Sequence, residues 1–203
     1  MAEVTPSRSA RAALRSDVTD GILGAVLDEL AAVGYGKLSM DGVARRARAG
    51  KAALYRRWPS KQDMVLDAVT SISLPAGKST SSGALPADIA DLVHGVNDWL
   101  SDPLMSRILP DLLAEAKRNT DLAAALTARI AVSRREYGHL VIGAAIDRGE
   151  LSPDVDVEYA LDLVAAPIFW RICGRRQDTT PQFLDRVVDS VLHALGVERF
   201  DAG

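Results

Sequence analysis

The residues most able to do chemistry lie in one short basic segment of the chain, from Ser39 to Lys61. Between Gly42 and Gln62 the chain has seven Lys or Arg residues and no Asp or Glu. Clustered guanidinium and ammonium groups attract polyanions, and the phosphate backbone of a nucleic acid is such a partner. The alternative is a solvated surface that binds nothing, although such surfaces usually contain balancing acidic residues.

No arrangement of residues typical of an enzyme accompanies this segment. The sequence has no HExxH, GxSxG or CxxC motif and no Gly-rich phosphate loop. The histidines, His94, His139 and His193, are not at metal-ligand spacing, and the single cysteine, Cys173, cannot form an internal disulfide. We therefore expect a protein that is not an enzyme, has no metal or cofactor, and works in the reducing cytoplasm.

Charge is divided unevenly along the chain. Residues 1–61 have eleven Lys or Arg against six Asp or Glu, whereas residues 62–203 have thirteen against twenty-one. The second part of the chain would repel a polyanion. The division therefore predicts that nucleic acid binds at the N-terminal end only.

The elements that must position the basic segment are helices. Apolar residues from Ile22 to Val33 repeat at helical spacing, and Gly34 ends that helix. Short helices are predicted over residues 40–47 and 51–57, separated by a three-residue break. Two short helices around a tight turn are the pattern of a helix-turn-helix, whose second helix enters the major groove of DNA.

The pattern as a whole predicts an all-α protein in three parts. Residues 1–15 are expected to form a flexible basic arm, residues 16–73 the helix-turn-helix domain with its connecting helix at 61–73, and residues 74–203 a second domain. A Gly-, Ser- and Pro-rich loop at 74–86 separates the two domains. Beyond it, cap and breaker residues predict a bundle whose helices cover about 87–100, 110–118, 121–148, 154 or 156 to 173, and 181–195.

The helix-turn-helix region resembles the DNA-binding domain of the TetR family of bacterial regulators. Residues Lys51–Lys61 (KAALYRRWPSK) are similar to the family's recognition helix and its exit, and Ser39–Ala44 (SMDGVA) to the start of the helix before it. The resemblance is tight over about residues 16–66 and looser beyond, where Ile108–Leu113 (ILPDLL) is similar to one subgroup. It implies a homodimer that binds palindromic double-stranded operator DNA, acts as a repressor, and is released by a small-molecule effector.

Position in the helix-turn-helix, together with the resemblance, indicates the role of each residue at the DNA. Lys51 and Arg56 are expected in the major groove, with Lys51 contacting either a base or only phosphate. Tyr55 is expected to bond a phosphate or else to pack in the core, and Trp58 to pack its ring while its N–H reaches a phosphate. Lys61 is expected to bind phosphate from the flank of the groove. The expected DNA-binding residues are Ser39, Arg45, Gly50, Lys51, Ala52, Ala53, Tyr55, Arg56, Trp58 and Lys61.

The resemblance also implies that the second domain dimerises and binds the effector. The last two helices would form the dimer interface, unless their apolar faces simply fill the subunit core. The apolar positions concerned are Leu161, Val164, Ile168, Phe183, Val187, Val191 and Leu195. The expected effector-binding residues are Trp99, Met105, Leu109, Leu112, Leu113, Tyr137, Phe169 and Trp170. Few of them are polar, so an apolar or aromatic effector is expected.

Some residues depart from the family's pattern, namely Arg48 in place of a turn glycine, and Ala49, Gly50 and Ala53. A left-handed backbone at Arg48 would cost about 1 kcal/mol or more. Ala53 can offer a base only a methyl contact. The operator sequence is therefore not predicted.

Two other classes of function compete with a regulator. A helical enzyme or carrier with an incidental basic end would not require a turn with correctly placed helix caps. A nucleoid-type protein that binds DNA without specificity would explain the basic segment but not the acidic domain behind it. No apolar run approaches the ~20 residues of a membrane span, so no membrane partner is expected.

Overall fold

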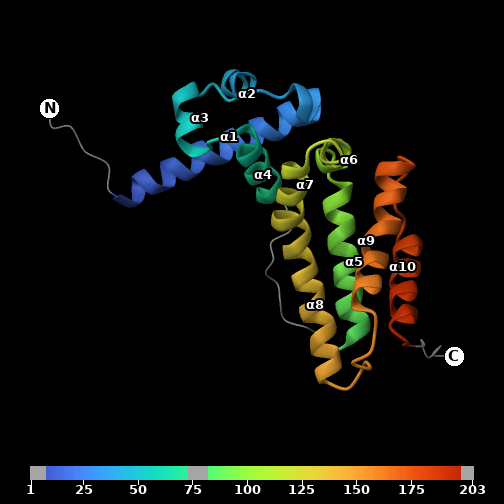
Figure 1. Ribbon diagram of the computed structural model, residues 1–203. Coiled ribbons are helices and arrows are strands. Elements are labelled where there is room, and N and C mark those ends of the chain that lie inside the picture. The colour runs from blue at the N-terminus through green and yellow to red at the C-terminus, as the bar shows by residue number, and fades with distance from the viewer. Residues whose placement is uncertain (1–7, 73–81, 198–203) are drawn as a thin grey trace.

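Helices form all the regular structure in the computed structural model, which describes residues 8–72 and 82–197. The predicted all-α class is therefore confirmed. Residues 8–72 pack together at one end of the molecule, and residues 82–197 form an elongated bundle that extends away from them (Figure 1).

The first helix, α1 (Arg8–Lys37), begins eight residues before the predicted start at residue 16. Residues 8–15 of the expected flexible arm are therefore helical, because Ala, Arg and Leu dominate that stretch and favour helix. Residues 1–7 of the arm lie outside the described residues. Gly34 has φ 75° and ψ 165°, so the regular helix is interrupted where the sequence predicts its end.

The helix-turn-helix consists of α2 (Met40–Arg46) and α3 (Lys51–Arg57), and α4 (Lys61–Ser71) follows it. The bounds of α2 and α3 agree with their predictions to within one residue, and α4 ends two residues before the predicted end of the connecting helix at residue 73. Ser39 and Ser60 begin α2 and α4, because each hydroxyl accepts a hydrogen bond of 3.1 Å from the backbone N–H three residues later.

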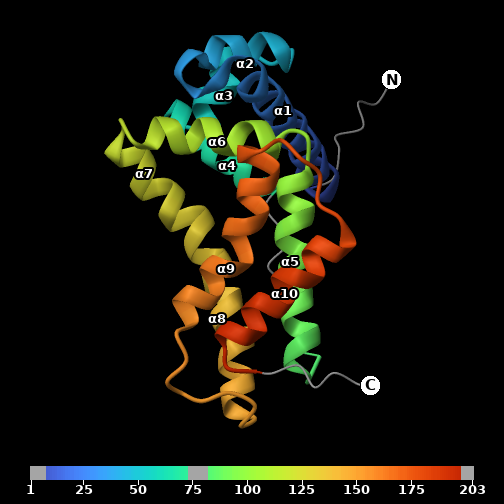
Figure 2. The same cartoon turned by 90° about the vertical axis from the view of Figure 1, so that its right-hand side faces the viewer.

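The bundle has α10 lying across α5 and α9, as Figure 2 shows. Its elements are α5 (Leu85–Ser101), α6 (Met105–Ala116), α7 (Thr120–Leu126), η1 (Thr127–Ala131), α8 (Val132–Asp147), α9 (Val157–Phe169), η2 (Trp170–Gly174) and α10 (Pro181–Ala194).

The start of α6 corrects the prediction that a helix begins at Pro110. The helix begins at Met105, and Pro110 lies inside it. The carboxylate of Asp102 permits this earlier start, because it accepts the backbone N–H groups of Leu104 and Met105 at 2.8 and 3.0 Å. Pro110 then only removes one hydrogen bond from the ladder of α6.

Two π-helical turns interrupt the bundle. The predicted single helix at 121–148 is divided into α7, η1 and α8, and the predicted helix that ends at residue 173 finishes as η2. A π-helical turn contains more residues per turn than an α-helix, and such turns are frequent at functional sites.

A residue with left-handed backbone closes several helices of the described chain. Gly149 and Gly196, with φ 76° and 78°, follow α8 and α10. In the same conformation, Arg48 (φ 50°) follows α2 and Arg176 (φ 54°) follows η2. Glycine adopts this conformation without strain, whereas another residue loses about 1 kcal/mol. The backbone is therefore strained at Arg48, where this chain departs from the turn glycine of the family.

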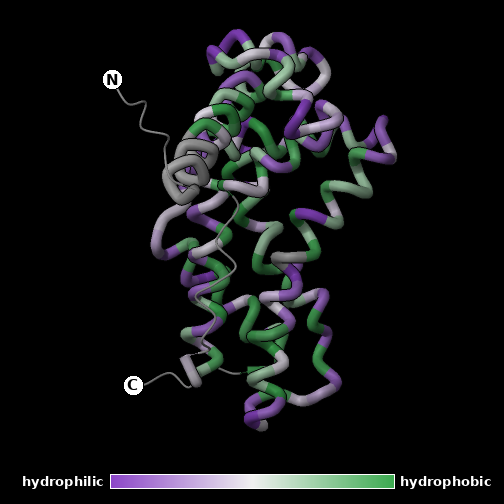
Figure 3. The backbone as a smooth tube through the Cα atoms, turned by 90° about the vertical axis from the view of Figure 1, so that its left-hand side faces the viewer, coloured by the Kyte–Doolittle hydropathy of each residue, from purple (hydrophilic) through white to green (hydrophobic). Residues whose placement is uncertain are grey.

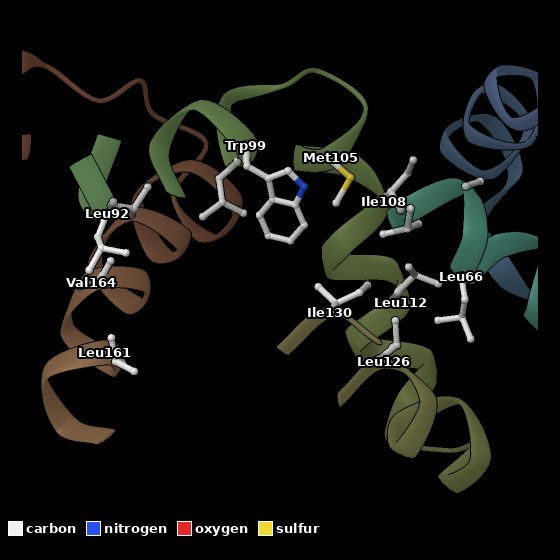
Figure 4. Packing of buried hydrophobic residues seen from close by; sticks show 14 of the residues in the cluster. Leu66, Leu92, Trp99, Met105, Ile108, Leu112, Leu126, Ile130, Leu161 and Val164 are labelled. Carbon is white, nitrogen blue, oxygen red and sulfur yellow. The ribbon is translucent and has the colours of Figure 1, made fainter. Parts of the chain in front are cut away.

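One apolar core extends from the helix-turn-helix domain into the bundle. Figure 4 shows part of it, where Leu66 of α4 lies beside Leu112 of α6. Hydrophobic and hydrophilic residues alternate along the helices in Figure 3 rather than forming one long apolar run. Within the described ranges, no helix is both long enough and apolar enough to cross a membrane.

Candidate functional site

The helix-turn-helix is built on a small set of buried apolar side chains. Met40 and Val43 of α2 and Leu54 of α3 are buried, where α2 packs against α1 and α3 packs against α2. With Leu54 turned inward, Lys51, Ala52, Tyr55 and Arg56 are exposed, and their spacing places them on one face of α3, while Ala53 is half-buried.

Tyr55 lies on this exposed face with 49% of its surface accessible, which corrects the alternative that it packs in the core. Ser39 and Gly50, the residues before α2 and α3, are exposed as well. A side chain added at Gly50 would meet no atom within 4 Å. The predicted contacts at both helix starts therefore remain accessible to a large partner.

The basic residues of the segment divide into two groups. Arg46 pairs with Glu29 at 2.7 Å, and Arg57 donates to Thr19 at 3.2 Å, so both bond within the protein. Across the described parts of the chain, the side chains of Arg45, Arg48 and Arg56 are exposed and make no hydrogen bond or ion pair. The basic residues of this segment that form no bond within the described chain are therefore Arg45, Arg48 and Arg56. Sequence reasoning did not place Arg48 in the DNA-binding set.

Lys51 has an acidic partner that lies just before the acid-free stretch of sequence. Its ammonium is 2.7 Å from the carboxylate of Asp41 and 5.9 Å from the centre of the Tyr55 ring. The hydrogen bond that Lys51 donates to Asp41 raises the pKa of Lys51, and the attraction of that carboxylate acts in the same direction. A phosphate or a base that binds Lys51 would therefore replace Asp41 as its partner.

Lys61 links the start of α4 to the end of α1. Its ammonium donates to the backbone oxygen of Tyr35 at 2.9 Å and lies 4.2 Å from the centre of the Tyr35 ring. An ammonium has three N–H donors, so this contact leaves two for a phosphate.

Trp58 corrects the prediction that its N–H reaches a phosphate. The side chain is buried, and the indole N–H donates to the carboxylate of Asp67 at 2.8 Å. The other oxygen of the same carboxylate is 3.0 Å from the guanidinium of Arg129, in η1. Asp67 thus joins the end of α3 to the bundle. The sequence signal that was missed is an acidic residue on the helix after a buried Trp.

A second contact joins the two domains at the end of α1. The backbone N–H of Tyr35 donates to Asp111 of α6 at 2.7 Å. Gly34 permits this approach, since a Cβ there would lie 2.9 Å from the Asp111 carboxylate. Because Tyr35 also accepts from Lys61, a continuous path runs from α6 to a predicted phosphate-binding residue.

An apolar cavity of about 440 Å³ lies among α5, α6, α8 and α9. Trp99, Leu109 and Phe169, all predicted effector-binding residues, line it. In Figure 4 the Trp99 ring points into the space between α9 on one side and α6 with η1 on the other. The charged residues of the lining, Arg135 and Asp162, form an ion pair. The cavity can therefore hold a mainly apolar molecule.

The other predicted effector-binding residues do not line this cavity. Met105 and Leu112 are fully buried in the core, because they lie on the face of α6 that packs inward. Leu113 and Trp170 have 44% and 64% of their surfaces exposed, because they lie on outward faces. Tyr137 is half-buried and packs against the core instead.

The predicted dimer positions are also corrected. They are turned toward the subunit core, where most are buried and Phe183 is half-buried, so the alternative interpretation holds for them. The positions are Leu161, Val164, Ile168, Phe183, Val187, Val191 and Leu195. A different stripe runs along α9 to the first residue of η2 at i, i+4, i+7 and i+11, where Tyr159, Ala166 and Trp170 are exposed and Leu163 is half-buried.

Metal binding has no support in the described residues, where no group of three His, Cys, Asp or Glu side chains could hold an ion.

Comparison with known proteins gives two family models that match successive parts of the chain. Residues 22–68 match the model for bacterial regulatory proteins of the tetR family. Residues 80–191, which are more than half of the chain, match the model for the tetracyclin repressor-like C-terminal domain. The first match ends before the Gly-, Ser- and Pro-rich loop at 74–86, and the second begins within that loop.

Similar proteins were found among both curated protein sequences and solved structures. The HTH-type transcriptional regulator YdeS of Bacillus subtilis is 29% identical over 74% of this chain and 76% of its own length. The DNA-binding transcriptional repressor TetR of Mycobacteroides abscessus is 28% identical over 86% of this chain and 91% of its own. The TetR family transcription regulator SCO0332 has a similar structure, with a TM-score of 0.68 and 25% identity, over 88% of this chain and 98% of that one.

Proposed function

The chain belongs to the TetR family of bacterial regulators and is a DNA-binding transcriptional regulator, and we propose that it represses transcription as a homodimer that a small molecule releases from a palindromic operator. The members of the TetR family are regulators, and we propose that this chain has no catalytic activity. A protein that works on chromosomal DNA is expected in the cytoplasm.

The observation that carries the proposal is the accessible basic face of the helix-turn-helix. Arg45, Arg48 and Arg56 are exposed and make no bond within the described residues, although acidic partners are available elsewhere in the protein. Basic side chains can contact DNA in two ways: contacts to phosphate fix the orientation of the protein, whereas contacts to base edges determine sequence choice. Lys51 and Arg56 are the proposed base contacts, and Ser39, Gly50, Tyr55 and Lys61 support them at the backbone.

A gel-shift experiment with the DNA upstream of the protein's own gene tests this proposal. Arg56→Ala should weaken the specific complex by about 1–3 kcal/mol if the side chain contacts a base. Arg186→Ala is the matched control, because Arg186 is an exposed arginine on α10, in the bundle. Selection from random DNA should return an inverted repeat. A featureless selected motif would instead show non-specific binding and contradict the proposal.

We propose that this stripe of α9 and the start of η2, formed by Tyr159, Leu163, Ala166 and Trp170, packs against a second copy of the chain. Tyr159 and Trp170 have 55% and 64% of their surfaces exposed, which is unusual for large apolar side chains in a finished assembly. Light scattering should give about 43 kDa, twice the 21.7 kDa of the chain. Trp170→Glu should lower that mass to the monomer value, and Trp170→Phe should not. A monomeric wild-type protein at micromolar concentration would contradict the dimer.

We propose that the effector occupies the apolar cavity and acts through the contacts between the domains. Ala131 of η1 and Leu109 of α6 line the cavity, and the same two elements bond to the DNA-binding domain through Arg129 and Asp111. An effector weakens DNA binding only by its different affinity for two arrangements of the domains, typically 1–3 kcal/mol. Calorimetric titration with and without operator should therefore give different effector affinities, and equal affinities would contradict the coupling.

A further inference from the structure

A second cavity, of about 760 Å³, lies where the end of α5, the first two turns of α6 and the segment after α9 meet. Unlike the apolar cavity, it has a largely polar lining. Two arginines, Arg107 of α6 and Arg176 of the segment after η2, line it together with Asp178 and Ser106.

Neither guanidinium has a partner within the protein. In the part of the chain that the structure describes, the side chains of Arg107 and Arg176 make no hydrogen bond or ion pair. The neighbouring Arg171 is different, since it donates to the backbone oxygen of Asp178 at 2.8 Å and stacks on the Phe183 ring. Arg171 thus holds the segment in place, while the two unpartnered cations line the cavity.

The backbone of Arg176 is strained. Its φ of 54° is the left-handed conformation that Gly149 and Gly196 provide without strain after α8 and α10. Strain of this kind concentrates at functional positions. Arg48, the other arginine with this conformation, lies in the turn of the helix-turn-helix. Both strained arginines therefore present an unpartnered positive charge at a surface that can receive an anion.

The two cavities are lined by neighbouring residues of the same helices. In α5, Leu100 lines the apolar cavity and Ser101 the polar one, and in α6 Leu109 lines the apolar cavity and Pro110 the polar one. Phe169, the last residue of α9, lines the apolar cavity, and Ile172 of η2, three residues later, lines the polar one. Each pair is at most three residues apart in sequence, so the two cavities open on neighbouring parts of the bundle.

We propose that the polar cavity is a head-group subsite of the effector site, where Arg107 and Arg176 bind a phosphate or carboxylate of an amphiphile whose apolar part occupies the neighbouring cavity. The inference rests on the proposed function, because it names the chemical class of the effector. Guanidinium groups bind both kinds of anion through paired N–H donors. The two arginines outweigh Asp178 by one positive charge, which disfavours a cationic head group. Cys173 is the other titratable group of the lining, and burial raises its pKa, so the thiol is neutral near pH 7 and does not oppose an anion.

The experiment compares dodecyl phosphate, dodecanoate and dodecanol, below their aggregation concentrations, by calorimetry on the full chain without DNA. Wild-type protein should bind at least one of the two anions about tenfold or more tightly than dodecanol, as charge-assisted hydrogen bonds require. The ratio between dodecyl phosphate and dodecanoate distinguishes a phosphate site from a carboxylate site.

Two variants locate the site of this preference. Arg176→Gly removes the charge and also relieves the strained backbone, so it should fold at least as well as wild type and should bind all three amphiphiles with nearly equal affinity. Arg175→Gln is the matched control, because Arg175 is the exposed neighbour that does not line the cavity, and it should keep the anion preference. As a second measurement, the preferred anion should slow alkylation of Cys173, which lines the polar cavity, and dodecanol should not.

Equal affinity of wild type for anions and dodecanol, no binding of any of them, or an undiminished preference in Arg176→Gly would overturn the proposal. The assay contains no DNA, so these results leave operator binding to be judged separately by gel shift. A protein that shifts its operator but shows no anion preference would refute only the head-group subsite.

Discussion

The backbone N–H of Tyr35 donates a hydrogen bond of 2.7 Å to the carboxylate of Asp111, 76 residues further along the chain. This bond joins the end of α1 to α6, and therefore the DNA-binding domain to a helix that lines both cavities. Gly34 makes room for it, because its ψ of 165° and φ of 75° are accessible essentially to glycine alone.

Asp111→Ala should lower the free energy of unfolding by about 1–3 kcal/mol, because it leaves the N–H of buried Tyr35 without its charged acceptor. Gly34→Ala should cost at least as much through backbone strain and the contact with the carboxylate. The double variant should cost less than the sum of the two, since removing the carboxylate relieves the clash. Urea unfolding measures all three, with the exposed Asp91→Ala as control. Additive losses would show that the two residues act independently.

Asp67→Ala should destabilise the protein by about 1–3 kcal/mol, because the buried indole N–H of Trp58 loses its acceptor. Arg129→Ala removes only an exposed partner of the same carboxylate, so about 1 kcal/mol or less is expected. Denaturant titration followed by tryptophan fluorescence compares them. Equal losses in the two variants would mean that the ion pair with Arg129, rather than the bond to Trp58, gives Asp67 its importance.

Arg48→Asn should raise the free energy of unfolding by about 0.5–1 kcal/mol, because asparagine tolerates the left-handed backbone better than arginine. The same change should weaken operator binding, because an unpartnered charge is lost from the DNA-facing side. Arg45→Asn, at an unstrained position of α2, should weaken DNA binding without any gain in stability. Thermal unfolding and gel shift together test both effects, and a destabilised Arg48→Asn protein would argue against strain in the turn.

Lys61→Ala should weaken specific and non-specific DNA binding alike and make the dependence of log affinity on log salt concentration less steep. If each subunit contacts about four phosphates, the slope of the dimer is near −7, and losing one contact per subunit changes it by roughly 2. Binding measured over a range of salt concentrations gives the slope, with Arg186→Ala as control. An unchanged slope would exclude Lys61 from the phosphate contacts and leave it a purely structural link to Tyr35.

The helix-turn-helix could be predicted to within a residue because its limits depend on local signals. Ser39 and Ser60 cap their helices through side chains only three residues from the bonded N–H groups. The effector cavity could not be predicted in this way. Leu109, Leu112 and Leu113 lie within five residues of one another on α6, yet they line the cavity, fill the core and face solvent, respectively. These side chains differ only in the direction in which they leave the helix axis. What each one meets in that direction depends on neighbouring helices that are distant in sequence.

The same reason explains the acidic residues that sequence analysis missed. Asp67 and Asp111 resemble ordinary surface carboxylates, and although Asp111 lies in the ILPDLL stretch, nothing in that stretch indicates a bond to another helix. The bond to Trp58 forms only when α4 folds back beside the end of α3, and the bond to the backbone of Tyr35 forms only when α6 packs against α1. A long-range bond to a backbone N–H leaves no pattern of residue types in the sequence.

The π-helical turn at Thr127–Ala131 has a consequence for insertions and deletions. One residue can be deleted within it without breaking the helix, because the remaining residues can close an ordinary α-helical turn. Each residue of an α-helix turns the chain by about 100°, so a deletion within α7 or α8 would rotate the two helices relative to one another. A deletion within the π-helical turn removes only the residue that the wider turn accommodates, so α8 keeps its direction and Arg135 still faces Asp162. A single-codon deletion here can therefore leave both the fold and the lining of the apolar cavity unchanged.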